Sequence, residues 1–235
     1  MSLLEREPLL TRLADLHAAA CGRRPQVVLV SGEAGAGKTV LIEAFCDRLD
    51  PGRVVWGACD PVVPAQPFGP LVDIAQQVGG EFADVFHRSV PRDIHEAFLH
   101  LMRGHDGPRV VVLDDMQWAD DATLDLVRVI GRRLRSVAGL IIVILRDDDL
   151  HPGHPVRLAL GDLPAASTTT LTVPGLSRPA VEALTAGTPI DADKQFQGGL
   201  LTLINPFGLL GGLTTLLLFQ VHGLVFLTLK TEGEI

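Results

Sequence analysis

Gly32-Glu33-Ala34-Gly35-Ala36-Gly37-Lys38-Thr39 is the stretch that decides the fold, and it directly follows the apolar run 27–30. Its first and sixth residues are glycines and it ends in Lys-Thr, which fits the phosphate-binding pattern G-x-x-x-x-G-K-[ST]. Glycine tolerates unusual backbone angles and close approach, so successive N–H groups of such a loop can point inward at a phosphate. A helical apolar pattern follows, and a helix N-terminus attracts anions. The stretch therefore predicts a strand, a nucleotide-binding loop and a helix in succession.

Each residue of this loop has an expected role. Lys38 is expected to reach the β- and γ-phosphates, and the Thr39 hydroxyl is expected to bind Mg²⁺. The amides expected to cradle the phosphates belong to Gly32, Glu33, Ala34, Gly35, Ala36 and Gly37. The alternative is a plain glycine-rich turn between a strand and a helix. A dinucleotide-binding fingerprint is excluded because Val40 stands where its third glycine should be.

Composition narrows the functional classes. The 235 residues leave room for one good-sized domain and an appendage. The net charge of -8 argues against a general nucleic-acid surface, which needs clustered Lys and Arg. Three cysteines without a C-x-x-C pair indicate neither a disulfide framework nor a zinc ribbon. With early charges at Glu5, Arg6 and Glu7 in place of a secretory signal, the sequence predicts a cytoplasmic protein.

Hydrophobic periodicity predicts the remaining elements. Helices are expected over 3–20, from the loop to about Leu49, over 69–78, 92–103 and 120–137, and from Ser177 onward. Strands are expected over 27–31, Val54–Ala58, 110–113, 140–145 and 169–173. The alternation of strands with helices predicts an α/β fold with a parallel sheet.

A second candidate half of the site is Val110-Val111-Val112-Leu113-Asp114-Asp115, in which a buried strand runs into two carboxylates. At the carboxyl end of a parallel strand, Asp114 would lie beside the phosphate loop and hold the Mg²⁺ hydration shell. Asp115 would polarise the attacking water as general base. The strand over 140–145 ends at Arg146, which can contact a γ-phosphate. The alternative for Arg146 is a pairing with Asp147, Asp148 or Asp149.

Taken together, these residues resemble the ATPase domain of the large LuxR-type transcriptional regulators, within the AAA-related signal-transduction P-loop ATPases. The resemblance covers residues 3–193. It rests on Leu4-Glu5-Arg6-Glu7, residues 31–39, Trp56-Gly57-Ala58-Cys59-Asp60-Pro61, Asp114-Asp115-Met116-Gln117-Trp118-Ala119-Asp120, Arg146-Asp147-Asp148 and His154-Pro155-Val156-Arg157.

The resemblance implies a five-stranded parallel sheet in the order 5-1-4-3-2, flanked by helices. It also implies ATP and Mg²⁺ as ligands, slow hydrolysis, and a switch that changes how the domain meets other subunits. Glu5-Arg6 lies where the family approaches the adenine, which adds Arg6 to the nucleotide-binding residues. Two features depart from the family: Ile144-Leu145 replaces a Thr-Tyr pair, and the lid, winged-helix, repeat and helix-turn-helix regions are not found after residue 193. Direct nucleic-acid binding by this chain is therefore not expected.

The resemblance ends at residue 193 and the composition changes abruptly from Gly198. Together these predict an ATPase domain over 1–193 and an apolar segment over 194–235. Residues 207–229 carry no charge and are long enough, at about 1.5 Å per residue, to cross a bilayer core of about 30 Å. The sequence predicts an apolar helix here that spans a membrane; a buried helix of a water-soluble fold is the alternative. Residues 200–235 resemble a transmembrane segment of cytochrome bd-type quinol oxidase subunit II. That resemblance leaves open a membrane fragment related to the oxidase subunit as an alternative function. A separate alternative to the ATPase is a nucleotide-binding interaction module that never hydrolyses.

Overall fold

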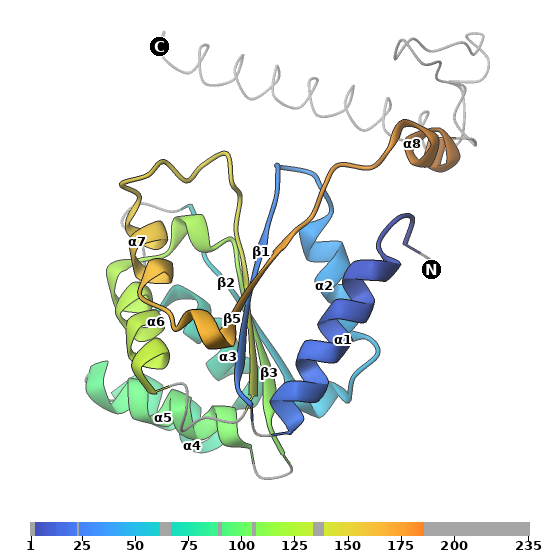
Figure 1. Ribbon diagram of the computed structural model, residues 1–235. Coiled ribbons are helices and arrows are strands. Elements are labelled where there is room, and N and C mark those ends of the chain that lie inside the picture. Colours follow the sequence, from blue (N-terminus) through green and yellow to red (C-terminus); the bar gives the residue numbers. More distant parts are fainter. Residues whose placement is uncertain are drawn as a thin grey trace, which may run out of the picture. The chain divides into compact units, whose positions relative to one another are not determined.

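The apolar runs fold into a five-stranded, all-parallel sheet (Figure 1). This computed structural model describes residues 3–22, 24–61, 67–88, 91–104, 107–133 and 139–185. The strands are β1 Gln26–Ser31, β2 Val54–Ala58, β3 Arg109–Asp114, β4 Gly139–Ile144 and β5 Thr168–Thr172. Their order, β2-β3-β4-β1-β5, is the expected order counted from the other edge. The α/β prediction and the parallel sheet are confirmed.

Helices cover both faces of this sheet, as Figure 1 shows. On one face lie α1 Glu7–Cys21 and α2 Lys38–Cys46. On the other lie α3 Gly69–Val78, α4 Gly80–Arg88, α5 Pro91–Arg103, α6 Asp121–Arg133 and α7 Pro155–Gly161. Because helices shield both faces, β3 and β4 need apolar side chains in both directions, which explains their unbroken hydrophobic sequence.

Two apolar cores result from the alternation of side chains along the strands. Val110 and Val112 pack with α1 and α2, whereas Val111 and Leu113 pack with the helices of the opposite face. All four of these side chains are fully buried. The central strands are thereby fixed in register, and their carboxyl ends meet at one edge of the sheet.

Several predicted boundaries differ from the structure. The first helix begins at Glu7 rather than residue 3, because Pro8 occupies its first turn. The helix after the loop ends at Cys46, since the amides of Arg48 and Leu49 bond three residues back and tighten the last turn. The strand predicted over 169–173 begins and ends one residue earlier. Helices α4 and α7 were not predicted.

The chain divides into two compact units between Leu176 and Ser177. In the second unit the structure describes α8 Arg178–Thr185, whose predicted start at Ser177 is confirmed by a bond from the Ala180 amide to the Ser177 hydroxyl (3.4 Å). The predicted apolar helix over 207–229, the segment 200–235 and the boundary at 193 lie outside the described residues. No helix in the described ranges has both the length and the apolar character to cross a membrane.

Candidate nucleotide-binding site

The loop between β1 and α2 has a backbone that only glycine adopts without strain. Gly35 and Gly37 have φ angles of +77° and +84°, and Gly37 is the N-cap of α2. A Cβ atom at either position would meet nothing within 4 Å, so conformation rather than crowding requires glycine there. At Gly32 a Cβ would lie 2.5 Å from the carbonyl oxygen of Val173, which follows β5. The loop is therefore set close against the sheet while its two later glycines face open space.

Lys38 lies inside the curve of this loop. Its side chain is 7% exposed, and Nζ donates to the carbonyl oxygens of Gly32 and Glu33 at 2.8 Å each. Burial lowers the pKa of Lys38, and the nearby Arg146 charge lowers it further, although aspartates around the loop oppose both. A buried ammonium group that donates to two backbone carbonyl oxygens suits a bound anion, which would supply the compensating charge.

The two predicted halves of the site meet at Thr39 and Asp114. The Thr39 Oγ1 donates to Asp114 Oδ2 at 3.1 Å, although 75 residues separate them in the chain. Asp114 is 7% exposed and also accepts a 2.8 Å bond from the Asp115 amide. Burial raises the pKa of Asp114 and the Asp115 charge adds to this, while the two hydrogen bonds oppose it.

These two oxygens fit Mg²⁺, which prefers hard oxygen ligands and usually keeps waters and phosphate oxygens in its shell. Within the described ranges no group of three or more His, Cys, Asp or Glu side chains could hold a metal ion without such help. The structure thus brings together both predicted metal ligands, in an arrangement that needs a phosphate to complete it.

Asp115 and Arg146 also come together. Asp115 has a left-handed backbone with a φ of +50°, and its Oδ1 lies 3.5 Å from Arg146 Nε. This pair corrects the alternative from the sequence: in the described part of the chain, the ion pair of Arg146 is with Asp115 and not with Asp147, Asp148 or Asp149. The reason is the sheet order, because β3 and β4 are neighbours and end side by side.

Arg6 ties the start of the chain to this site. It is 4% exposed, and its Nη2 donates to the carbonyl oxygens of Ala36 (3.1 Å) and Pro174 (2.7 Å). Its Nη1 is buried without a hydrogen-bond partner. The contact with Ala36 places Arg6 against the loop, as expected of a residue that lines the nucleotide site.

With this geometry established, comparison with known proteins identifies the family. Residues 2–144, more than half of the chain, match the family described as "AAA ATPase domain". The chain belongs to this family. It is an AAA-type P-loop ATPase domain.

Solved structures support the same fold. The Orc1 protein of Aeropyrum pernix in complex with DNA matches with a TM-score of 0.56 and 21% identity over 85% of this chain and 52% of that one. Cdc6p from Pyrobaculum aerophilum matches with a TM-score of 0.55 and 16% identity over 79% of this chain and 49% of that one. Drosophila ORC bound to DNA matches with a TM-score of 0.56 and 14% identity over 79% of this chain and 47% of that one. The chain spans about half the length of these proteins, and at such identities the likeness shows the fold alone.

A short stretch has a different relative. Over 49 residues the chain is 45% identical to cytochrome bd ubiquinol oxidase subunit 2 of Bacillus subtilis. The match covers 21% of this chain and 14% of that subunit. It is too short to assign the chain to the oxidase family.

Sequence reasoning missed three polar contacts around the AAA site. The Ala34 amide donates to Asp148 Oδ2 at 3.3 Å, so a carboxylate now accepts from an amide that the loop pattern assigns to phosphate. Gln117 bonds to the side chain of Asp115 and to the backbone of Arg146. Neither contact has a sequence signal, because the partners are set by which strands end side by side and, for Gln117 with Asp115, by how the turn after β3 is wound.

The third missed contact is made by Asp120, which directly precedes α6. It accepts from the Thr123 amide at 3.0 Å and so caps this helix. It also accepts from the amides of Phe68 (3.0 Å) and Gly69 (3.2 Å) at the start of α3. Burial raises the pKa of Asp120, but the hydrogen bonds from the Thr123 hydroxyl and from the amides of Phe68, Thr123 and Gly69 outweigh burial and hold that pKa below its ordinary value.

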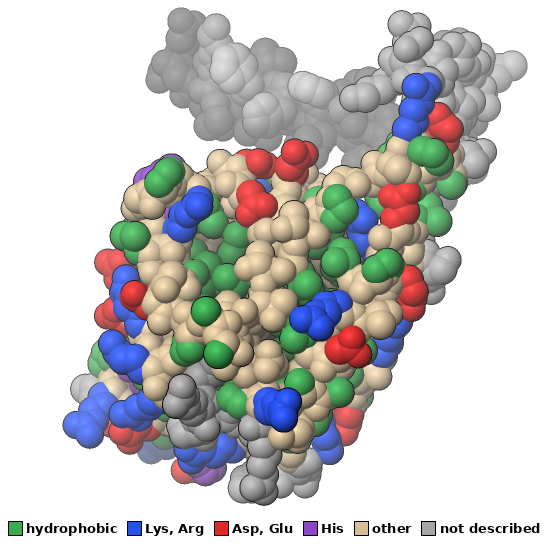
Figure 2. Space-filling model, in the orientation of Figure 1, with side chains coloured by type: hydrophobic (Ala, Val, Ile, Leu, Met, Phe, Trp, Pro, Cys, Tyr) green, Lys and Arg blue, Asp and Glu red, His purple; other side chains and the backbone are tan. Residues whose placement is uncertain are grey.

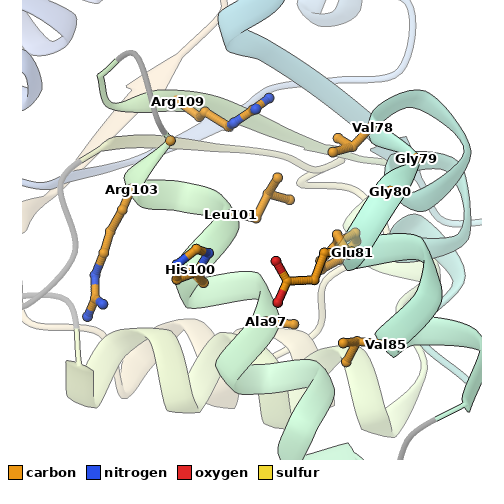
Figure 3. Close-up of a pocket in the computed structure, with 12 residues that line it drawn as sticks. Val78, Gly79, Gly80, Glu81, Val85, Ala97, His100, Leu101, Arg103 and Arg109 are labelled. Carbon is orange, nitrogen blue, oxygen red and sulfur yellow. The ribbon is translucent and has the colours of Figure 1, made fainter.

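A cavity of about 320 Å³ lies at the other end of β3, away from the loop (Figure 3). Arg109 begins β3, whereas Asp114 ends it. In Figure 3 the Arg109 side chain extends toward Val78, while Glu81 and His100 lie deeper between α4 and α5. The cavity is separated from Lys38 and Asp114 by the length of a strand, so it takes no part in the nucleotide site.

A second hollow, of about 490 Å³, lies between the sheet and α7. Leu29, Leu145 and Leu160 line its apolar part, and Ser31 and Asp147 lie at the end near the loop. Figure 2 shows hydrophobic side chains beside the backbone of β5 on this face.

Proposed function

We propose that this AAA domain binds Mg·ATP at residues 32–39 and hydrolyses it slowly as a regulatory switch. The observation that carries the proposal is the 3.1 Å contact between Thr39 and Asp114. It brings the end of the phosphate loop to the acidic end of β3, and these are the two groups that an Mg·triphosphate requires.

The binding residues follow from the loop. The amides of Gly32, Glu33, Ala34, Gly35, Ala36 and Gly37 would surround the phosphates, with Lys38 reaching the β- and γ-phosphates. Arg6 would line the nucleotide site next to Ala36. Thr39 and Asp114 would hold Mg²⁺, which when bound would neutralise developing charge on the phosphate oxygens. A triphosphate would also compete with Asp148 for the Ala34 amide.

Hydrolysis would use Asp115, Lys38 and Arg146. Asp115 would take a proton from the attacking water while the water oxygen bonds to the γ-phosphorus and the bond to the ADP oxygen breaks. Lys38 and Arg146 would stabilise negative charge on the transferring group. Arg146 now pairs with Asp115, so arrival of a γ-phosphate offers this arginine a second anionic partner.

The regulatory part of the proposal rests on the resemblance to LuxR-type regulators and on the AAA family. In a switch, the ATP and ADP forms would differ in how the domain meets a second copy or another subunit. DNA binding is not proposed for this chain, because its net charge of -8 provides no general basic surface. The division into an ATPase domain over 1–193 and a second segment over 194–235 also stays a proposal.

A module that binds ATP without hydrolysis is the second candidate, and one observation favours it. Oδ1 of Asp115 is engaged by both Gln117 and Arg146, so this oxygen is not free to accept a proton from water in this conformation. Turnover by the full chain would decide between the two.

The test combines binding with turnover. ATP at about a hundred times its Kd should stabilise the full chain by about 2.7 kcal/mol in thermal melts with Mg²⁺. Asp115→Asn should keep this stabilisation and stop phosphate release. Stabilisation without any wild-type turnover would leave the non-hydrolysing module, and the absence of stabilisation by any adenine nucleotide would contradict both.

A further inference from the structure

Gln117 is a buried polar side chain that the proposed function does not use. It is 4% exposed and lies in the short 3-10 turn Met116–Trp118, directly after Asp115. Its Nε2 donates to Asp115 Oδ1 at 2.7 Å. Its Oε1 accepts from the Arg146 amide at 3.3 Å. One side chain thus joins the segment after β3 to the second residue after β4.

The Gln117 bond is the tighter of the two contacts that reach Asp115 Oδ1. The Arg146 contact is 3.5 Å long, and both side chains are about two-fifths exposed. It is therefore a surface ion pair that contributes little free energy. The amide bond is 2.7 Å long and is made by a buried group. Rotation of the Asp115 carboxylate is therefore limited by Gln117 more than by Arg146.

Asp115 needs such a support because its backbone is strained. A φ of +50° is uncommon for a non-glycine residue, and such conformations persist where surrounding contacts hold them. The turn supplies one, from the Trp118 amide to the Asp115 carbonyl oxygen (3.0 Å). Gln117 supplies the contact to the side chain.

We infer that Gln117 is a positioning residue, which orients Asp115 toward the attacking water and ties that orientation to the backbone at Arg146. The inference rests on the proposed function. In the hydrolytic step, the water oxygen bonds to the γ-phosphorus, the bond to the ADP oxygen breaks, and the water proton passes to Asp115. Gln117 touches none of these atoms and acts through Asp115 alone.

Two variants distinguish the bond that Gln117 Nε2 donates from the bond that Gln117 Oε1 accepts. Gln117→Glu keeps an oxygen that can accept from the Arg146 amide, but replaces the donor to Asp115 with a second carboxylate oxygen. Gln117→Met removes both bonds at similar side-chain volume. Gln76→Glu makes the same change in charge at an exposed position of α3 and serves as the control. All are made in the full chain.

The measurements are kcat for ATP hydrolysis, Kd for ATP and Tm. Both Gln117 variants should lose at least about tenfold in kcat, a part of what a positioned general base contributes, with Kd within about twofold of wild type. Gln76→Glu should leave all three unchanged. Adding Gln117→Met to Asp115→Asn should cause no further loss of the residual single-turnover rate, since the group that Gln117 orients is already disabled.

Each other outcome overturns the inference. One such outcome is an unchanged kcat in both variants, and another is a raised Kd with an unchanged kcat. A third is that Gln117→Met lowers the single-turnover rate by the same factor in the Asp115→Asn background as in wild type, which would indicate a purely structural role. If Gln117→Met does not fold, the result for Gln117→Glu decides. Unchanged kcat in both variants of a protein that does hydrolyse ATP overturns this inference alone. Wild-type protein that binds ATP without turnover overturns this inference and the proposed hydrolysis, but leaves the proposed ATP binding in place. Protein that binds no ATP overturns the proposed function as well.

Discussion

At the scale of single residues, Lys38 is the charge on which nucleotide affinity depends. Replacing it with Ala removes the buried ammonium while the loop amides remain. We expect ATP affinity to fall at least about a hundredfold, which corresponds to about 2.7 kcal/mol. Titration calorimetry measures the loss. Arg12→Ala, at an exposed position of α1, is the control for loss of a positive charge, and equal weakening in both would refute a specific role for Lys38.

Replacing Asp114 should weaken the binding of Mg²⁺ but raise the stability of the nucleotide-free protein. Its pKa is raised in the folded protein, so its ionisation costs stability as pH rises from 3.8 through the folded pKa. Asp114→Asn can still bond to Thr39 and the Asp115 amide without the charge. At pH 7 the nucleotide-free variant should melt higher, by roughly 2–4 °C if the relief is about 1 kcal/mol.

Two measurements check this expectation. The difference in Tm should narrow as the pH is lowered, because wild-type Asp114 takes up its proton. The additional stabilisation that Mg²⁺ gives to the ATP complex should disappear in Asp114→Asn. A variant that melts lower than wild type at pH 7, or that keeps the full Mg²⁺ effect, is incompatible with a buried, charged metal ligand.

At the scale of elements, one carboxylate connects two helices. Asp120 accepts from amides at the starts of both α3 and α6. Loss of a single N-cap costs about 0.5–2 kcal/mol, so Asp120→Ala should lower the free energy of unfolding by about 2–4 kcal/mol. Urea denaturation measures this, with Asp121→Ala at the exposed neighbouring position as the control.

The pH dependence follows from the pKa of Asp120, which is depressed in the folded protein. Its contribution is present above the ordinary value of 3.8 and is lost as pH falls through the folded pKa. The gap between wild type and Asp120→Ala should therefore close in strongly acidic solution. A gap that stays constant down to pH 2 would mean that the charge of Asp120 is not what the amides use.

The elements that could be predicted are those with a complete local signal. β3 and β4 are unbroken apolar runs because both faces are covered, and the loop is fixed by the pattern of Gly32, Gly37 and Lys38. Helix α4 has apolar residues at helical spacing, among them Phe82 and Phe86, but it is only nine residues long and starts at Gly80, directly after Gly79, where the sequence indicates a break. Helix α7 is short and begins at Pro155, which stands as readily in a turn.

The same limit applies within the site. The meeting of Thr39 with Asp114 could be predicted because two known patterns each end at the carboxyl edge of a sheet. Gln117 and Asp148 carry no such pattern. Their partners are set by which strands lie side by side and by how the turn after β3 is wound.

At the scale of the whole molecule, every residue assigned to ATP lies before Leu176, in the first of the two compact units. The family match, over residues 2–144, falls in the same unit. The nucleotide site is therefore expected to be complete without the rest of the chain. Protein ending at residue 194 should bind ATP with a Kd within about twofold of that of the full chain, a difference in free energy below about 0.5 kcal/mol.

Calorimetry on both proteins, with Lys38→Ala made in each, checks this expectation. Lys38→Ala should abolish binding to the same extent in the two lengths, which shows that the same site is measured. A shortened protein that folds but binds ATP more than about tenfold weaker would place part of the affinity, about 1.4 kcal/mol, beyond residue 194. The ATPase domain would then extend past its predicted end at 193, and the C-terminal segment would belong to the site rather than follow it.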